Sequence, residues 1–170
     1  MVPEKQIAIF ALTGLTLGIV IDVLLLKRVL ATGYNRKIGF LAAIYLFYSV
    51  GIFGFFMGVP IFNVLPGICA AIYVARRASL SKWENARFKR YLNRTAWFTV
   101  AVLLLLCIAS AFLALSDPHT SNNISGMFGL SFKITGGMLW GIVIAGGVLL
   151  VGFQYGVVRY IGIKAAAHWQ

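Results

Sequence analysis

Five long runs of apolar residues constrain the fold of this chain more than any other feature. A helix needs about 20 apolar residues to cross the hydrocarbon core of a bilayer. Charged residues make up 11% of the chain, whereas a soluble domain carries about 25%. We therefore predict an all-α integral membrane bundle of five transmembrane helices that form a single domain over residues 1–170. The predicted spans are 7–26, 38–59, 61–75, 95–115 and 134–158.

The second and third runs together are too long for one ordinary span, and two prolines divide them. Proline removes a backbone donor and disfavours helix in the residue before it. Pro60 and Pro66 therefore indicate a turn followed by a new helix. We expect a hairpin whose third helix, 61–75, is short and proline-broken, with Arg76 and Arg77 snorkelling to complete the span. A re-entrant segment at 61–75 is the alternative.

The basic residues test this arrangement, because cytoplasmic loops are enriched in lysine and arginine. With five crossings, segments 27–37, 76–94 and 159–170 share one side and hold all but two of the 15 basic residues. This asymmetry predicts a multi-pass protein of the cell membrane with its N-terminus outside and its C-terminus inside. Four crossings would place the first two of these segments on opposite sides.

The net charge of +11 would suggest nucleic-acid binding in a soluble protein. In a chain this apolar, lysine and arginine in cytoplasmic loops explain the positive charge more simply. We therefore expect no nucleic-acid partner. The expected partners are the bilayer and its anionic headgroups, together with further copies of the chain or a larger membrane complex.

A basic helix is predicted over residues 82–94, continuous with the fourth span. Ser81 and Glu84 have the spacing of a capping box, in which each side chain caps the helix start. Trp83 and Tyr91 are expected at the membrane interface. The candidate residues for binding anionic headgroups are Arg87, Lys89, Arg90 and Arg94.

Small residues four positions apart allow transmembrane helices to approach closely. Pairs of this kind occur in the first and second spans, and a longer series follows the fifth span. Two interpretations stay open, namely packing within the chain and contact with a second chain or a larger complex. The candidate packing residues are Gly14, Gly18, Gly54, Gly58, Gly137, Gly141, Ala145, Gly152 and Gly156.

Asp22 is the one acidic residue inside a predicted span. A charge there costs about 2.5–3.5 kcal/mol on insertion scales, so it should face protein or water. Lys27 or Arg159 could neutralise it, and Gln154 and Tyr155 are expected at a similar depth. Three interpretations of Asp22 stay open, namely a structural ion pair, an ion or proton relay, and simple exposure at the lipid headgroups.

Further polar candidates lie in the second and third runs. Asn63 stands between the two prolines, where a broken helix can expose backbone groups to a ligand, or where it simply forms the hairpin turn. Tyr45, Tyr48 and Ser49 have helical spacing. They either line a polar cavity or hydrogen-bond to neighbouring helices.

No catalytic constellation is present in the sequence. His119 and His168 fall outside the spans, and Cys69 and Cys107 lie alone within apolar runs, so we expect no metal or cofactor. The leading hypothesis is a non-enzymatic, transport-related component or subunit of a membrane complex that acts through its glycine faces. The alternatives are a membrane enzyme acting on lipid or isoprenoid phosphates at the cytoplasmic interface, and a lipid-binding scaffold.

Overall fold

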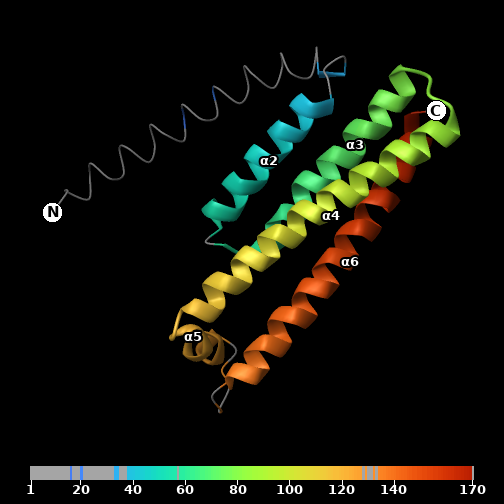
Figure 1. Cartoon of the computed structure of the whole chain (residues 1–170). Helices are drawn as coiled ribbons and strands as arrows, with labels where there is room; N and C mark the ends of the chain where they lie inside the picture. Colours follow the sequence, from blue (N-terminus) through green and yellow to red (C-terminus); the bar gives the residue numbers. More distant parts are fainter. Residues whose placement is uncertain are drawn as a thin grey trace. The chain divides into compact units, whose positions relative to one another are not determined.

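The structure is a computed structural model that describes residues 16, 20, 33–34, 38–56, 58–127, 129, 132 and 134–169. Within these residues all regular structure is helical (Figure 1). The elements are α2 (Ile38–Phe55), the 3-10 helix η1 (Pro60–Asn63), α3 (Val64–Leu80), α4 (Asn85–Ser116), α5 (Thr120–Met127) and α6 (Gly136–Trp169).

The chain divides into two compact units, Met1–Ala43 and Ile44–Gln170, with the boundary inside α2. In the first unit the described residues include the start of α2. The second unit contains the remainder of α2 and every later element, and the core lies in it.

Among the described residues, four helical segments are long and apolar enough to cross a membrane, which supports a multi-pass membrane protein. They are α2, the segment Pro60–Leu80 formed by η1 and α3, α4 and α6. At a rise of about 1.5 Å per residue, α4 and α6 are each roughly 50 Å long, well above the hydrocarbon thickness of about 30 Å. Both helices are therefore long enough to extend beyond the bilayer. The first predicted span, 7–26, lies outside the described residues except for Thr16 and Val20.

The predicted break between the second and third runs is confirmed. Helix α2 ends at Phe55, and Gly58 has a positive φ of 81°, which glycine adopts without steric cost. Val59 is extended and Pro60 begins η1, where a missing N–H leaves no helical bond unmade. Pro66 lies in the first turn of α3, a position that tolerates proline for the same reason.

The expectation of a short third helix is wrong. From Pro60 the chain stays helical for 21 residues, to Leu80, and includes Arg76 and Arg77. The segment does not turn back on itself, so it has no re-entrant form. The two arginines continue the helix, for which arginine has a high propensity, and their guanidinium groups lie over tryptophan rings, Arg76 over Trp169 and Arg77 over Trp83.

The turn between α3 and α4 also differs from the prediction. Ser81 is the C-cap of α3, and α4 begins at Asn85 with Glu84 as an N-cap that makes no side-chain cap bond. The N–H of Trp83 donates to the carbonyl of Ala78 over 2.9 Å, and that of Lys82 to the carbonyl of Ser79 over 3.2 Å. This pair of bonds is a Schellman motif. Ser81 therefore ends one helix and does not cap the next.

Two further helical stretches extend the sequence prediction. The polar segment after α4, between the fourth and fifth predicted spans, contains the short helix α5. Helix α6 continues past Val158 to Trp169, so the predicted fifth span is the first part of a longer helix.

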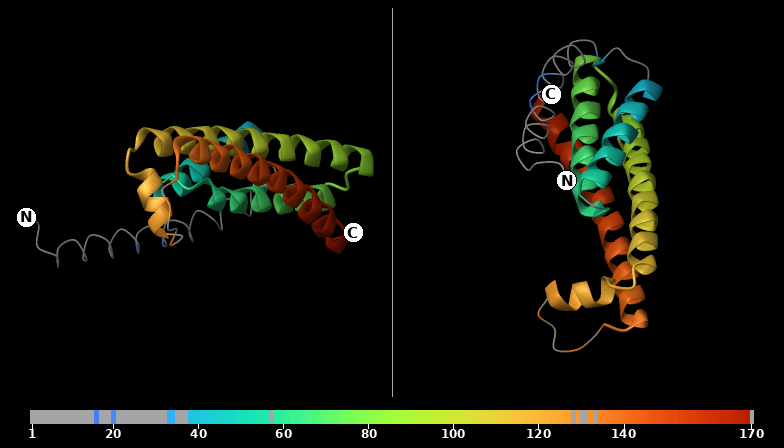
Figure 2. Two further views of the ribbon diagram at one scale, coloured as in Figure 1. Left: turned by 90° about the horizontal axis from the view of Figure 1, so that it is seen from below. Right: turned by 90° about the vertical axis from the view of Figure 1, so that its left-hand side faces the viewer.

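Helices α3, α4 and α6 pack side by side and form the core (Figures 1 and 2). Helices α3 and α6 run in the same direction, and α4 runs against both. Small side chains on α3 let the helices approach closely. The buried cluster comprises Ala71, Ala75, Ala78, Phe88, Leu92, Ala96, Val158 and Ala166.

Candidate functional site

The contact between α3 and α6 centres on a fully buried glutamine. Gln154 of α6 has no exposed surface, and its amide lies directly against the backbone of α3 at Gly67. A Cβ atom at position 67 would collide with the Gln154 amide. Because Gly67 has no side chain, the core has room there for the polar side chain of Gln154, which belongs to a predicted span.

A second close contact at a glycine lies nearer the C-terminal end of α6. A Cβ atom on Gly162 would collide with the side chain of Leu92 in α4. The sequence prediction missed both glycines. The signal was nevertheless present in the sequence, as small residues spaced by four. They are Gly67, Ala71 and Ala75 on α3, and Gly162 and Ala166 on α6.

Two buried amides lack hydrogen-bond partners among the described residues. Both side-chain polar atoms of Gln154 and both of Asn63 are unpaired, and Asn63 is 1% exposed. Asn63 precedes Gly67 by about one helical turn and caps α3 without a side-chain bond. An unpaired buried amide costs free energy. These neutral groups can donate and accept hydrogen bonds, but they cannot act as acids or bases at neutral pH.

The polar residues of α2 do not share one buried surface. Ser49 is fully buried, whereas Tyr48 is 45% exposed and its ring packs edge-on against Phe47. The ring of Tyr45 packs 5.4 Å from that of Phe98 in α4. The described ring contacts of these two tyrosines are thus with aromatic side chains of α2 and α4.

Tyr155 and Arg159 lie together on α6. The Tyr155 hydroxyl donates to Oδ1 of Asn93 over 2.9 Å and accepts a bond of 3.3 Å from Nη1 of Arg159. This exposed network joins α6 to α4. Asp22 lies outside the described residues, and so does any pairing of Asp22 with Arg159 or Lys27.

The glycine series of α6 faces away from the core. A Cβ atom at Gly137, Gly141, Gly152 or Gly156 would have no atom within 4 Å among the described contacts. In the most apolar window of α6 only 6% of residues are buried. The series therefore makes no packing contact inside the described bundle.

The other predicted glycine pairs are placed differently. Gly58 lies in the turn after α2, where a Cβ atom would lie 3.2 Å from Cδ1 of Leu113. Gly54 lies inside α2 with open space around it. The two residues therefore do not form a pair on one helix. Gly14 and Gly18 lie outside the described residues.

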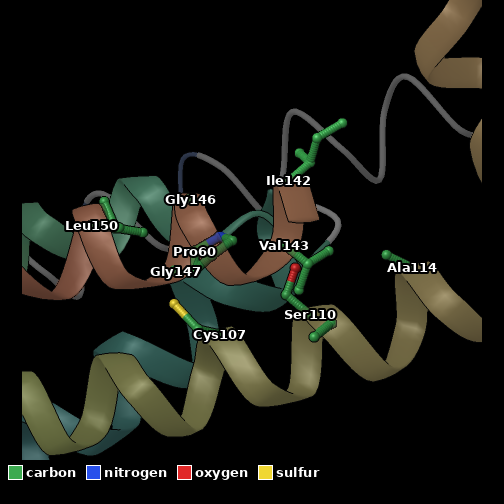
Figure 3. Close-up of a pocket in the computed structure, with 10 residues that line it drawn as sticks. Pro60, Cys107, Ser110, Ala114, Ile142, Val143, Gly146, Gly147 and Leu150 are labelled. Atoms are coloured by element: carbon green, nitrogen blue, oxygen red, sulfur yellow. The ribbon is translucent and has the colours of Figure 1, made fainter. Parts of the chain in front are cut away.

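A shallow pocket lies between α4 and α6 near Pro60 (Figure 3). Its volume is about 170 Å³, and small residues such as Ala111 and Gly146 line it. Ser110 and Cys107 are the most polar of its lining residues. None of the described residues that line it carries a carboxylate, imidazole or amine.

The end of the bundle where α3 ends, α4 begins and α6 ends is strongly basic. Arg87 is stacked on the rings of Trp83 and Tyr91, whereas Lys89, Arg90 and Arg94 are exposed without a ring contact among the described residues. Of the four predicted headgroup ligands, Arg87 alone is held in a defined position by such a contact.

Comparisons of the chain with protein-family models, with curated proteins and with solved structures find no significant match.

Proposed function

We propose that the chain is a multi-pass subunit of a membrane complex that docks on another transmembrane helix through the glycine face of α6. This glycine face consists of Gly137, Gly141, Ala145, Gly152 and Gly156. The complex consists either of copies of this chain or of this chain and a different membrane protein.

The geometry of α6 carries this proposal. Successive residues of an α-helix are separated by about 100°. Ala145 is therefore about 180° from Gln154, and Gly152 and Gly156 are each about 160° from it. One side of α6 packs on α3 and α4 through Gln154 and Val158, while the glycine face points the opposite way.

Exposed apolar surface alone would not distinguish a docking face, because lipid covers such surface equally well. Glycine does distinguish it, since glycine inside a helix costs about 0.5–1 kcal/mol relative to alanine. Close backbone approach between helices compensates that cost in membranes. A Cβ atom at any of the four glycines of this face would meet open space, so no helix of the described bundle makes such an approach there.

Cysteine cross-linking in native membranes tests the proposal. The two native cysteines, Cys69 and Cys107, are free and are first replaced by alanine. Single cysteines at Gly141, Ala145 and Gly152 are expected to form intermolecular products, and the mass of each product distinguishes a second copy from another protein. Ala101→Cys on the exposed side of α4 is the control. Absence of products along the glycine face, or equal yield from the control, contradicts the proposal.

A bulky substitution gives an independent measurement. Leucine at both Gly141 and Gly152 adds bulky side chains to the glycine face. The change should weaken association by about 1–3 kcal/mol, or roughly five- to a hundredfold. Ala101→Leu adds a larger side chain to an exposed helix surface away from the glycine face, so it should leave association unchanged. Because the glycines face away from the core, helicity and detergent stability should be preserved in both variants.

A further inference from the structure

The basic end of the bundle carries arginines without counter-charges. The described lysines and arginines there are accompanied by a single acidic residue, Glu84, and within the described part of the chain none of them forms an ion pair. They are Arg76, Arg77, Lys82, Arg87, Lys89, Arg90, Arg94, Arg159 and Lys164. Arg76 and Arg77 are half-buried, so water screens them less than it screens the exposed cations.

Two of these arginines converge on one aromatic ring. Cζ of Arg87 lies 5.1 Å from the ring centre of Trp83, and Cζ of Arg77, from α3, lies 6.0 Å from the same centre. The ring of Tyr91 packs 4.7 Å from that of Trp83 and also supports Arg87, at 5.8 Å. The turn between α3 and α4 therefore holds two guanidinium groups around a single tryptophan.

The hydrogen-bonding capacity of these groups is available. Neither guanidinium group donates a hydrogen bond or forms an ion pair among the described residues, and the N–H donors of a guanidinium group lie in one plane. Planar donor pairs fit the oxygens of a phosphate group in a bidentate way. Two arginines that contact one ring, with no carboxylate partner in the described part of the chain, can therefore donate to a phosphate ester.

The location of the site favours a lipid over a soluble phosphate. Helix α3 is part of a segment apolar enough to cross the membrane, and Arg77 lies in its last turn. Tryptophan and tyrosine are enriched at the level of lipid headgroups. We propose that Arg77 and Arg87, held on Trp83, bind the phosphate of an anionic phospholipid.

Native mass spectrometry of the full chain in detergent tests this site. Phosphatidylglycerol, phosphatidylcholine and inorganic phosphate are titrated separately. The site predicts retention of phosphatidylglycerol at least about tenfold above phosphatidylcholine, with no retention of inorganic phosphate at the same concentration. Retention of inorganic phosphate without a preference for phosphatidylglycerol overturns the assignment to a lipid.

Matched double variants separate a defined site from diffuse surface charge. Arg77→Gln with Arg87→Gln should weaken phosphatidylglycerol binding at least about tenfold more than Lys89→Gln with Arg90→Gln, which removes the same charge from positions without ring contacts. Equal losses would mean that net charge alone attracts the lipid, and would overturn the proposal. Arg87→Gln alone, at an exposed position, gives the answer if the double variant fails to fold. It should weaken binding more than Lys89→Gln does.

Discussion

Two residues that face each other across the core, Gln154 and Gly67, determine how α6 packs on α3. The Gln154 amide occupies the volume that a side chain at position 67 would need. A polar side chain is thereby removed from lipid and held against backbone. Its amide atoms have no hydrogen-bond partner among the described residues, so the stability of this contact comes from the close packing of the amide on the Gly67 backbone and not from hydrogen bonds.

We predict that Gly67→Ala destabilises the chain by about 1–3 kcal/mol, since the added methyl group forces α3 and α6 apart or displaces the glutamine. Thermal unfolding in detergent measures the effect. Gly51→Ala in α2, where a Cβ atom meets open space, is the control and should be neutral or slightly stabilising. In a Gln154→Ala background the same Gly67→Ala change should cost almost nothing, because the two effects are coupled. An equal cost in both backgrounds would mean that the amide is not the obstacle.

Individual polar residues of the core could be predicted from the sequence better than the residues that they contact. Gln154 was identified as a polar residue inside a span, and Asn63 as a polar residue at a helix break. Gly67 was not identified, because small-residue spacing occurs in several helices and the spacing alone does not say which series is buried. The series containing Gly67 faces the core, whereas the series containing Gly141 faces outward. Only packing distinguishes the two.

At the scale of the elements, the end of α3 contains a strained residue. Lys82 has a positive φ of 47° and occupies the position of the Schellman motif where glycine is most common. A left-handed backbone conformation costs a residue with a side chain about 1–2 kcal/mol. The strain persists because the two backbone bonds of the motif and the packing of Trp83 on the core hold the turn in place.

We predict that Lys82→Gly stabilises the chain by about 0.5–1 kcal/mol, since part of the relieved strain is offset by the greater freedom of glycine in the unfolded chain. The midpoint of thermal unfolding in a mild detergent should rise accordingly. Lys82→Ala removes the same charge but keeps the Cβ atom, so it should bring no such gain. A similar increase in both variants would trace the effect to charge repulsion rather than to backbone strain.

Helix boundaries were predicted well where the residue type dictates the backbone and poorly where two signals compete. Pro60 removes a donor whatever surrounds it, and the predicted break there is confirmed. Ser81 is suited both to end one helix and to begin another, and tertiary packing of Trp83 and Ala78 decides for the former. The arginines after Ala75 are typical of the end of a span, but the aromatic rings that contact them come from the turn before α4 and from α6, which the sequence pattern alone does not bring together.

At the scale of the whole molecule, the distribution of charge gives the chain its expected orientation. The described lysines and arginines lie toward the end of the bundle where α3 ends and α4 begins. The bond of 2.9 Å from Oγ of Ser79 to the carbonyl of Trp169 brings the end of α6 to the same place. Segments 76–94 and 159–170, which charge alone assigned to one side, thus meet at one end of the bundle.

We predict that this end faces the cytoplasm and that the N-terminus lies outside, with five crossings in all. A fluorescent protein fused after Gln170 should fluoresce, whereas alkaline phosphatase at the same position should be inactive. The same reporters inserted after Asn122, in α5, should give the opposite results. An active phosphatase after Gln170 would reverse the orientation and would contradict five spans with an outer N-terminus.

The space at Gly67 also limits how the helices can move. A shift of α6 by one turn along α3 would bring the Gln154 amide against the methyl group of Ala71 in one direction and the side chain of Asn63 in the other. Either shift would lose the space that Gly67 provides, so we expect sliding of α6 along α3 to be unfavourable in both directions. We therefore expect the two helices to move together in any rearrangement of the described bundle.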